Sequence, residues 1–289
     1  MAGRLHGKVM LITGAGSGLG REVALLAAEE GAKVAVTDKI EARIGPVVEA
    51  ITAKGGAAAG LKADVTVEPE VEAAVAFARE TFGTLDVAHA NAGVTVPGQG
   101  TVPLEDTTLE SWHTVNEVNL TGVFLTIKHA ARAMKQAGGG AIVVTSSAAS
   151  LVSYPGFGIY AAGKAGVNGL VRAAAYDLGR YGIRVNAVCP THGMSVNFGL
   201  PPDAPVVGKS YEEAAGPWDP AAAVMPLRLA RPPTLQDNAW PVIFLASDES
   251  AYMSGVCFPT ADGGQHARTS IPFPDNWALD RQAAESHPG

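Results

Sequence analysis

A tyrosine and a lysine four residues apart supply the side chains needed for proton transfer. The stretch Tyr160-Ala-Ala-Gly-Lys164 has a helical pattern, so the phenol and the ammonium share one helix face. A nearby positive charge favours the phenolate, which would lower the tyrosine pKa from about 10 and make the side chain a usable acid or base. Such a pair is often only a surface contact. Here Ser146 and Ser147 end the preceding predicted strand, at the edge where open α/β sheets bind ligands, and this favours chemistry.

A glycine-rich turn between the first predicted strand and the first predicted helix indicates a phosphate site. Residues 13–20 read TGAGSGLG. Glycine allows a tight turn and lets a pyrophosphate approach main-chain N–H groups, and the following helix N-terminus adds donors and the positive end of a dipole. The turn lacks the Gly-Lys-Ser/Thr ending of a P-loop, which argues against nucleoside triphosphate hydrolysis.

Asp38 closes the second predicted strand, 24 residues after Gly14. An acid at this place can accept hydrogen bonds from the adenosine ribose and repels a 2′-phosphate, so the expected cofactor is NAD. The alternative is an aspartate that only caps the next helix or turn. Lys39 weakens the case against NADP without reversing it.

The elements that must position these residues alternate along the chain. Strands are predicted at 8–13, 33–37, 57–62, 85–90, 141–145, 183–188 and 256–259. Helices are predicted at 20–30 (capped by Gly31), 47–52, 67–82, 160–181 and 236–247, with a further helical stretch that is broken near 116–121 and runs to about 136. This alternation implies a parallel sheet covered on both faces or an eightfold barrel, and the pattern alone does not separate the two.

Composition narrows the function classes. The 289 residues carry a formal net charge of -7, which argues against nucleic-acid binding. The two cysteines, Cys189 and Cys257, exclude a disulfide framework, fit a reducing compartment and are expected to be buried small hydrophobes. The seven histidines show no metal-ligand spacing, so no metal is expected. Without an apolar run of about 20 residues or a signal peptide, the protein is expected to be soluble and cytoplasmic, with no membrane partner.

Residues 196–234 depart from the alternation and are rich in proline. Long irregular segments in compact domains are usually lids, binding loops or disorder. The aromatic residues Phe198, Tyr211 and Trp218 favour an ordered lid.

In combination, these motifs resemble the short-chain dehydrogenase/reductase family, from about Gly7 to Gly264. The cofactor turn matches Thr13-Gly14-x-x-x-Gly18-x-Gly20, and two further segments match Asp64-Val65 and Asn91-Ala92-Gly93. The resemblance implies an α/β fold with a single-domain, doubly wound parallel sheet (a Rossmann fold) and helices on both faces, which excludes the barrel. Residues 1–264 would form the NAD-binding catalytic domain with its lid at about 196–234, and residues 265–289 would form a C-terminal extension.

The resemblance also assigns a catalytic tetrad of Asn119, Ser147, Tyr160 and Lys164. Tyr160 would be the general base in alcohol oxidation and the general acid in ketone reduction. Lys164 would hold the nicotinamide ribose and lower the tyrosine pKa. Ser147 would hydrogen-bond the substrate oxygen, and Asn119 would position a water that relays protons through Lys164. The expected cofactor contacts are Gly14, Ser17, Gly18, Leu19, Gly20, Asp38, Asp64, Val65, Asn91, Ala92, Gly93, Tyr160, Lys164, Pro190, Gly193 and Ser195.

The segment after the predicted strand 183–188 departs from the family pattern. The family usually has Pro-Gly where this chain has Pro190-Thr191, and often threonine where it has Ser195. The serine keeps a hydroxyl for the nicotinamide amide, and Gly193 falls where a main-chain N–H would meet that carboxamide.

The expected substrate pocket is mostly apolar, which favours an alicyclic, terpenoid, steroid-like or aryl secondary alcohol over a sugar. Its predicted residues are Val94, Tyr154, Phe157, His192, Met194 and Phe198. For His192, a substrate contact and an ordinary loop position are both open.

Two alternatives to an NAD-dependent dehydrogenase are an NADP-dependent carbonyl reductase and a non-catalytic NAD(H) sensor on the same fold. Sensors of that kind typically lose the tyrosine or the lysine, and this chain keeps both. The resemblance implies a homo-oligomer, a tetramer or a dimer, packed through the helix that carries Tyr160 and through the C-terminal region.

Overall fold

The strands come together as one parallel sheet in the computed structural model, which describes residues 3–96, 98–152, 154–198, 204–223 and 229–267. Within these residues, the sheet order is β3-β2-β1-β4-β5-β6-β7. The strands are β1 Val9–Thr13, β2 Lys33–Asp38, β3 Ala57–Lys62, β4 Val87–Ala90, β5 Gly140–Thr145, β6 Ile183–Pro190 and β7 Cys257–Thr260. The chain runs outward from β1 to β3 and then returns to place β4 on the other side of β1. Doubly wound sheets bind ligands at such a switch point, whereas a closed barrel has none.

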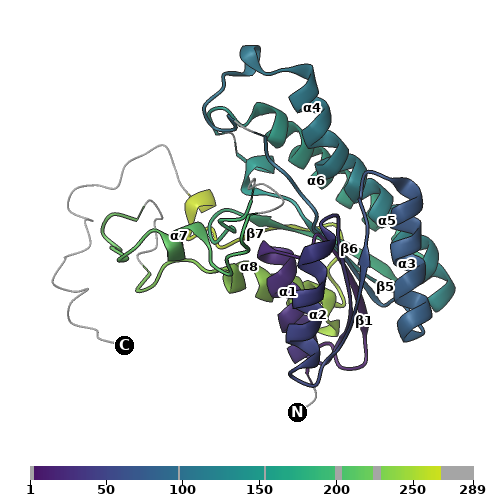
Figure 1. Ribbon diagram of the computed structural model, residues 1–289. Coiled ribbons are helices and arrows are strands. Elements are labelled where there is room, and N and C mark those ends of the chain that lie inside the picture. Colours follow the sequence, from purple (N-terminus) through teal and green to yellow (C-terminus); the bar gives the residue numbers. More distant parts are fainter. Residues whose placement is uncertain (1–2, 97, 153, 199–203, 224–228, 268–289) are drawn as a thin grey trace.

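Helices cover both faces of the sheet (Figure 1). The helices are α1 Gly18–Glu29, α2 Ile44–Thr52, α3 Glu68–Phe82, α4 Leu109–Asn116, α5 Gly122–Ala137, α6 Gly158–Gly179, α7 Tyr211–Ala214 and α8 Leu235–Ala246. One core joins α1, α2 and α8 to the sheet, and the other joins α3, α5 and α6 to its opposite face. In β1, Met10 and Ile12 belong to the first core and Leu11 to the second, so both faces of this strand must be apolar.

The predicted elements are confirmed in type and order, with small shifts at their ends. The predicted strand 57–62 coincides with β3, and α6 begins two residues before the predicted start at Tyr160. Gly31 ends α1 with a positive φ of 89°, as expected for a left-handed cap. At α3, Gly83 has the same role with a φ of 93°.

The expected break in the α-helical pattern near residues 116–121 is confirmed in position, but it is a change of helix type and not a gap. The chain continues from α4 through one π-helical turn, Glu117–Thr121, directly into α5. A π turn widens the helix by one residue and is frequent at functional sites. This turn carries Asn119, which is fully buried.

The segment predicted as a lid contains α7 in its described part. Ser195 pairs with Ser210 in an isolated antiparallel bridge, and the Ser210 hydroxyl donates to the Pro233 carbonyl at 2.8 Å. The start and the end of this segment therefore meet at the residue that caps α7. Residues 199–203 and 224–228 of the predicted lid lie outside the described residues, as do residues 268–289 of the expected C-terminal extension.

Cys189 is fully buried as expected, but Cys257 is only partly buried because β7 is an edge strand. No helix among the described residues is long and apolar enough to cross a membrane.

Candidate active site

A cavity of about 450 Å³ lies at the switch point of the sheet. The glycine turn, the end of β2 and the loops after β3 and β4 contribute its walls, together with α6 and the first residues of the predicted lid. The predicted residues that line it are Gly14, Ser17, Gly18, Leu19, Asp38, Asp64, Val65, Asn91, Ala92, Gly93, Val94, Tyr160, Lys164, Met194, Ser195 and Phe198.

The remaining predicted residues, all within the described part of the chain, do not line this cavity. They are Gly20, Asn119, Ser147, Tyr154, Phe157, Pro190, His192 and Gly193. Gly20, Asn119, Ser147 and Phe157 contact residues that do. A Cβ on Gly20 would collide with the carbonyl oxygen of Gly14, and Pro190 ends β6.

The glycine turn forms a cradle with no room for side chains. Gly14 has a φ of 63°, and a Cβ there would lie 2.8 Å from Ala92 Cα. Gly18 has a φ of 54°, and a Cβ there would lie 2.8 Å from the Ser195 side chain. A bare backbone at a helix N-terminus fits the pyrophosphate of a dinucleotide.

The Asp38 carboxylate accepts a hydrogen bond from the glycine turn and also lines the cavity. Its Oδ2 accepts a hydrogen bond from Gly16 N at 2.9 Å, and its Oδ1 accepts one from Ile40 N at 2.9 Å. The side chain is buried, yet it lines the cavity. The capping role and a ribose-binding role are therefore compatible at this carboxylate.

Lys39, which follows Asp38 in the chain, forms an ion pair with Asp64. The Lys39 ammonium lies 2.7 Å from Asp64 Oδ2. Burial raises the pKa of Asp64, but hydrogen bonds from Lys39 and Thr66 outweigh burial and leave this pKa below its usual value.

Lys164 is buried beside Tyr160. Its Nζ donates to the Thr145 carbonyl at 2.8 Å and lies 5.7 Å from the centroid of the Tyr160 ring. Burial lowers the pKa of Lys164 to about 8, so the side chain remains mostly charged at neutral pH.

Burial raises the pKa of Tyr160 to about 12, and a hydrogen bond with Ser147 only partly opposes it. The expected lowering of this pKa by Lys164 is therefore wrong for this structure. The Lys164 ammonium lies 5.7 Å from the centroid of the ring and is hydrogen-bonded to Thr145, while burial of the phenol is the largest cause of the raised pKa.

Asn119 braces the loop that follows β4. Its Oδ1 accepts from Val94 N at 2.8 Å, and its Nδ2 donates to Val94 O at 2.9 Å. A Cβ on Gly93 would lie 3.3 Å from Asn119 Oδ1 and 3.8 Å from Lys164 Nζ, so the three residues meet at one point. These contacts fix the orientation of the Asn119 side-chain amide, and its expected role in holding a water stays a prediction.

An aromatic row extends from the Tyr160 phenol ring. Ring centroids are 5.9 Å apart for Tyr154 and Phe157, 6.1 Å for Phe157 and Tyr160, and 6.3 Å for Tyr160 and Phe198, all with edge-to-face geometry. Val115 and Ile159 are buried in the same apolar cluster. Of the six residues predicted as pocket walls, Tyr154, Phe157 and Phe198 belong to this cluster around Tyr160.

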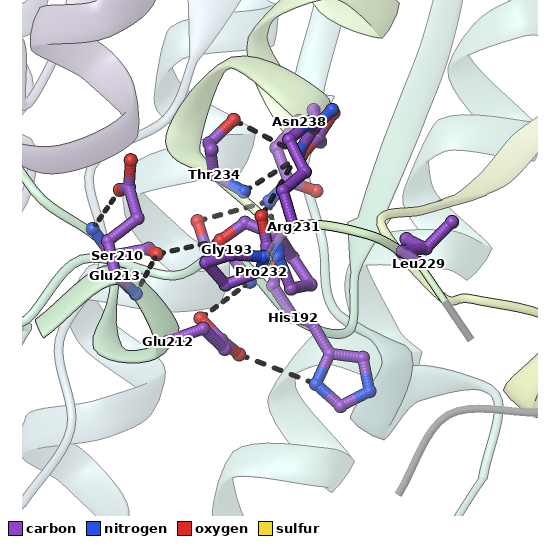
Figure 2. Close-up of polar contacts among 12 residues, drawn as sticks. His192, Gly193, Ser210, Glu212, Glu213, Leu229, Arg231, Pro232, Thr234 and Asn238 are labelled. Atoms are coloured by element: carbon purple, nitrogen blue, oxygen red, sulfur yellow. Dashed lines mark hydrogen bonds and ion pairs between the residues drawn. The ribbon is translucent and has the colours of Figure 1, made fainter. Parts of the chain in front are cut away.

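His192 and Gly193 contact the predicted lid (Figure 2). Glu212 Oε2 accepts from Gly193 N at 3.1 Å, and Glu212 Oε1 lies 3.4 Å from His192 Nδ1. The other ring nitrogen of His192 lies 3.0 Å from Gln265 Oε1, and Asn238 Nδ2 donates to the His192 carbonyl at 2.8 Å. Burial raises the pKa of Glu212, but hydrogen bonds from His192 and Gly193 outweigh it and lower this pKa.

Sequence reasoning missed several residues that shape the site. Thr145 and Asn197 line the cavity, while Glu212 and Asn238 hold its rim from α7 and α8. The position of Thr145 at the end of a strand, directly before Ser146, was a usable signal. For Glu212 no sequence signal existed, because its partners lie in the loop after β6.

Comparisons with known proteins agree with this geometry. A family model described as short chain dehydrogenase matches residues 8–195. A cyclohexanol dehydrogenase of Acinetobacter sp. (strain SE19) is 39% identical over 257 residues, which cover 88% of this chain and 94% of that protein. A cis-4-hydroxycyclohexanecarboxylate dehydrogenase of Sinomonas cyclohexanicum is 39% identical over 261 residues, covering 90% of this chain and 97% of that protein.

Among solved structures, a 7α-hydroxysteroid dehydrogenase complexed with NADH and 7-oxo glycochenodeoxycholic acid superposes with a TM-score of 0.76 and 30% identity. The match covers 90% of this chain and 95% of that one. From the family match, the similarity of these relatives over most of their length and the shared fold, it follows that this chain belongs to the short-chain dehydrogenase family of oxidoreductases.

Proposed function

We propose that this protein is an NAD-dependent dehydrogenase that interconverts a hydrophobic cyclic secondary alcohol and its ketone. One observation carries the proposal: Tyr160 and Lys164 line the same cavity as the glycine cradle and Asp38. The proposed proton-transfer pair and the proposed dinucleotide site thus share one cavity. A nicotinamide dinucleotide bound there would supply the hydride acceptor or donor.

The chain's own residues would handle the proton. In ketone reduction Tyr160 donates its phenol proton to the substrate oxygen, and its pKa of about 12 keeps it protonated at neutral pH. Ser147, hydrogen-bonded to Tyr160, can also hydrogen-bond that oxygen and stabilise the charge that develops on it. In alcohol oxidation Tyr160 acts as the phenolate, which the ammonium of Lys164 would stabilise, and it accepts the alcohol proton to become the neutral phenol.

The aromatic row supports a cyclic, apolar substrate. Phe198 lines the cavity edge-to-face with the Tyr160 ring, and Phe157 packs on Tyr160 from outside the cavity, so the surroundings of the reacting phenol are apolar and suit an alicyclic or aryl ring. The names of the two relatives above, a cyclohexanol and a hydroxycyclohexanecarboxylate dehydrogenase, point to the same substrate class. Terpenoid and steroid-like alcohols share this chemistry and extend the panel to be tested.

NAD is proposed over NADP because the Asp38 carboxylate lines the cavity, where it would accept from ribose hydroxyls and repel a 2′-phosphate. We expect kcat/KM to be at least about tenfold higher with NAD than with NADP, which corresponds to about 1.4 kcal/mol. The assay follows the absorbance of the reduced cofactor with cyclohexanol and larger cyclic alcohols as substrates. The Asp38→Asn variant should have a smaller ratio of kcat/KM with NAD to kcat/KM with NADP. A preference for NADP would overturn the Asp38 argument. NADH binding without turnover of any alcohol or ketone would favour the sensor alternative.

A further inference from the structure

A buried histidine lies beneath the candidate active site, and the proposed mechanism does not use it. His89 on β4 is fully buried. Its Nε2 lies 2.9 Å from Thr145 Oγ1, whereas its Nδ1 has no hydrogen-bond partner among the described residues. Burying a polar ring with one nitrogen unpaired costs free energy. We therefore asked what the one hydrogen bond of this ring contributes to the site.

The hydrogen-bond partners of Asn91 fix the direction of this bond. Asn91 Nδ2 lies 3.1 Å from Thr13 O and 3.2 Å from Gly14 O, and both carbonyls can only accept. The amide is therefore oriented with Oδ1 toward Thr145. Because Oδ1 also only accepts, it takes the one hydroxyl proton of Thr145, at 3.0 Å. Thr145 then offers His89 only a lone pair, so His89 Nε2 must carry the proton.

The electrostatics agree with this assignment. Burial lowers the pKa of His89 to about 3, which keeps the ring neutral at physiological pH. A neutral ring with its proton on Nε2 leaves Nδ1 without a proton. Nδ1 is then an acceptor and not a donor, and it is the ring nitrogen that has no partner among the described residues.

We propose that His89 is a positioning residue for the cofactor site: as the neutral Nε2–H tautomer it begins a one-way hydrogen-bond chain through Thr145 and Asn91 to the glycine turn. The chain is continuous, since each proton has one acceptor and each link is 2.9 to 3.2 Å long. This inference rests on the proposed function, because it concerns the cofactor that the cavity is proposed to bind.

Thr145 is the point from which this chain reaches both halves of the cavity. Its hydroxyl leads to Asn91 and the glycine turn, and its carbonyl accepts from Lys164 Nζ at 2.8 Å. Strand pairing with β6 already holds the Thr145 backbone, which leaves its hydroxyl as the part that His89 orients. Loss of His89 would free that hydroxyl to turn away from Asn91, so cofactor affinity would weaken more than the fold.

The test compares NADH binding to the full chain and to three variants, by titration of cofactor fluorescence. His89→Leu fills the same space without a donor and should raise the Kd for NADH by about 5- to 10-fold, the range for one lost hydrogen bond. His89→Gln places a donor nitrogen the same number of bonds from Cα and should restore the Kd to within about twofold of wild type. As a matched control, His129→Leu removes another buried histidine, one that pairs with Glu68 outside the cavity, and should leave the Kd unchanged.

Each outcome decides between the two proposals. If His89→Leu binds NADH as wild type does, or if His89→Gln binds as weakly as His89→Leu, the positioning role is wrong. If wild type does not bind NADH at all, the proposed function fails. Should His89→Leu not fold, ¹⁵N chemical shifts of the histidine rings in wild type still decide. They should give a protonated Nε2 and a bare Nδ1 for His89 from pH 5 to 9, and a proton on Nδ1 or a titrating ring would overturn the inference.

Discussion

Burial, more than charge, controls the titration of the residues proposed to transfer the proton. It raises the pKa of Tyr160 to about 12 and lowers that of Lys164 to about 8, so burial shifts both groups toward their neutral forms, although Lys164 stays mostly charged at neutral pH. The Tyr160 proton is therefore held firmly until a substrate oxygen accepts it. Charge on the substrate or the cofactor, which would lie in this cavity, would be the means of shifting these values during turnover.

His89 gives the fold a dependence on pH. Its pKa is about 3 in the folded protein and about 6.5 in an unfolded chain, so between these values only the unfolded state binds a proton. The stabilising contribution is full above pH 6.5 and is lost as pH falls toward 3. At pH 5 the loss is about 2 kcal/mol relative to pH 8, at about 1.4 kcal/mol per pH unit. In urea unfolding at both pH values, wild type should lose about 2 kcal/mol more than His89→Gln. Equal losses would mean that the folded ring titrates normally.

The sequence motifs predicted which residues form the candidate site, but they did not predict which contacts these residues make. Tyr160 and Lys164 were identifiable because their spacing on one helix is local, and helix geometry fixes it. The hydrogen-bond network of His89 could not be identified from the sequence, because it joins β4 to β5 through side chains that only strand pairing brings together. The direction of the pKa shift at Tyr160 was also beyond reach, since it depends on burial that no local pattern encodes.

At the scale of elements, the rim of the cavity is held from α7 and α8. Glu212 on α7 bonds Gly193 N and faces His192, while Asn238 on α8 bonds the His192 carbonyl (Figure 2). Arg231 and Asp237 form a two-pronged ion pair, with both N–O distances 2.7 Å, where the predicted lid enters α8. The predicted lid is thus attached near α7 and at its end.

Glu212→Ala should loosen α7 without unfolding the protein. It removes both contacts with the loop after β6, and if these contribute about 1 kcal/mol together, trypsin should cleave after the exposed Lys209 about 5-fold faster. The measurement is the cleavage rate at Lys209 beside the urea midpoint of the whole protein. As a control, Glu72→Ala changes an exposed glutamate on α3 and should leave the rate unchanged. An unchanged rate for Glu212→Ala would show that this contact does not hold α7.

The order of elements was predictable because hydrophobic runs and glycine caps are local signals, as at β3 and Gly31. The π turn at Glu117–Thr121 was not, because its widening serves a tertiary contact between Asn119 and Val94. A break in periodicity signalled an irregularity, but it did not distinguish a helix end from a π turn.

At the scale of the molecule, the switch point between β1 and β4 explains why residues from distant parts of the chain share one cavity. Parallel strands end at a common edge, so the glycine turn after β1 and the Asn91–Gly93 loop after β4 become neighbours. Beside Tyr160, the cavity is also lined by residues of α6 and by the first residues of the predicted lid.

The homo-oligomer packed through α6 stays a prediction of the family resemblance. Tyr176 on this helix is 89% exposed in the single chain and would be covered if α6 packed against a second copy. We expect light scattering to give two or four times the 29.6 kDa of the chain, with four favoured by the family resemblance. A mass equal to one chain would contradict the prediction.

Tyr160→Phe tests the central claim most directly, because it removes one oxygen and keeps the aromatic row. The variant and wild type are compared in alcohol oxidation with NAD and in NADH binding. Loss of general acid–base catalysis should lower kcat by at least about 100-fold, while the Kd for NADH stays within about threefold of wild type. Turnover by Tyr160→Phe at the wild-type rate would contradict the account.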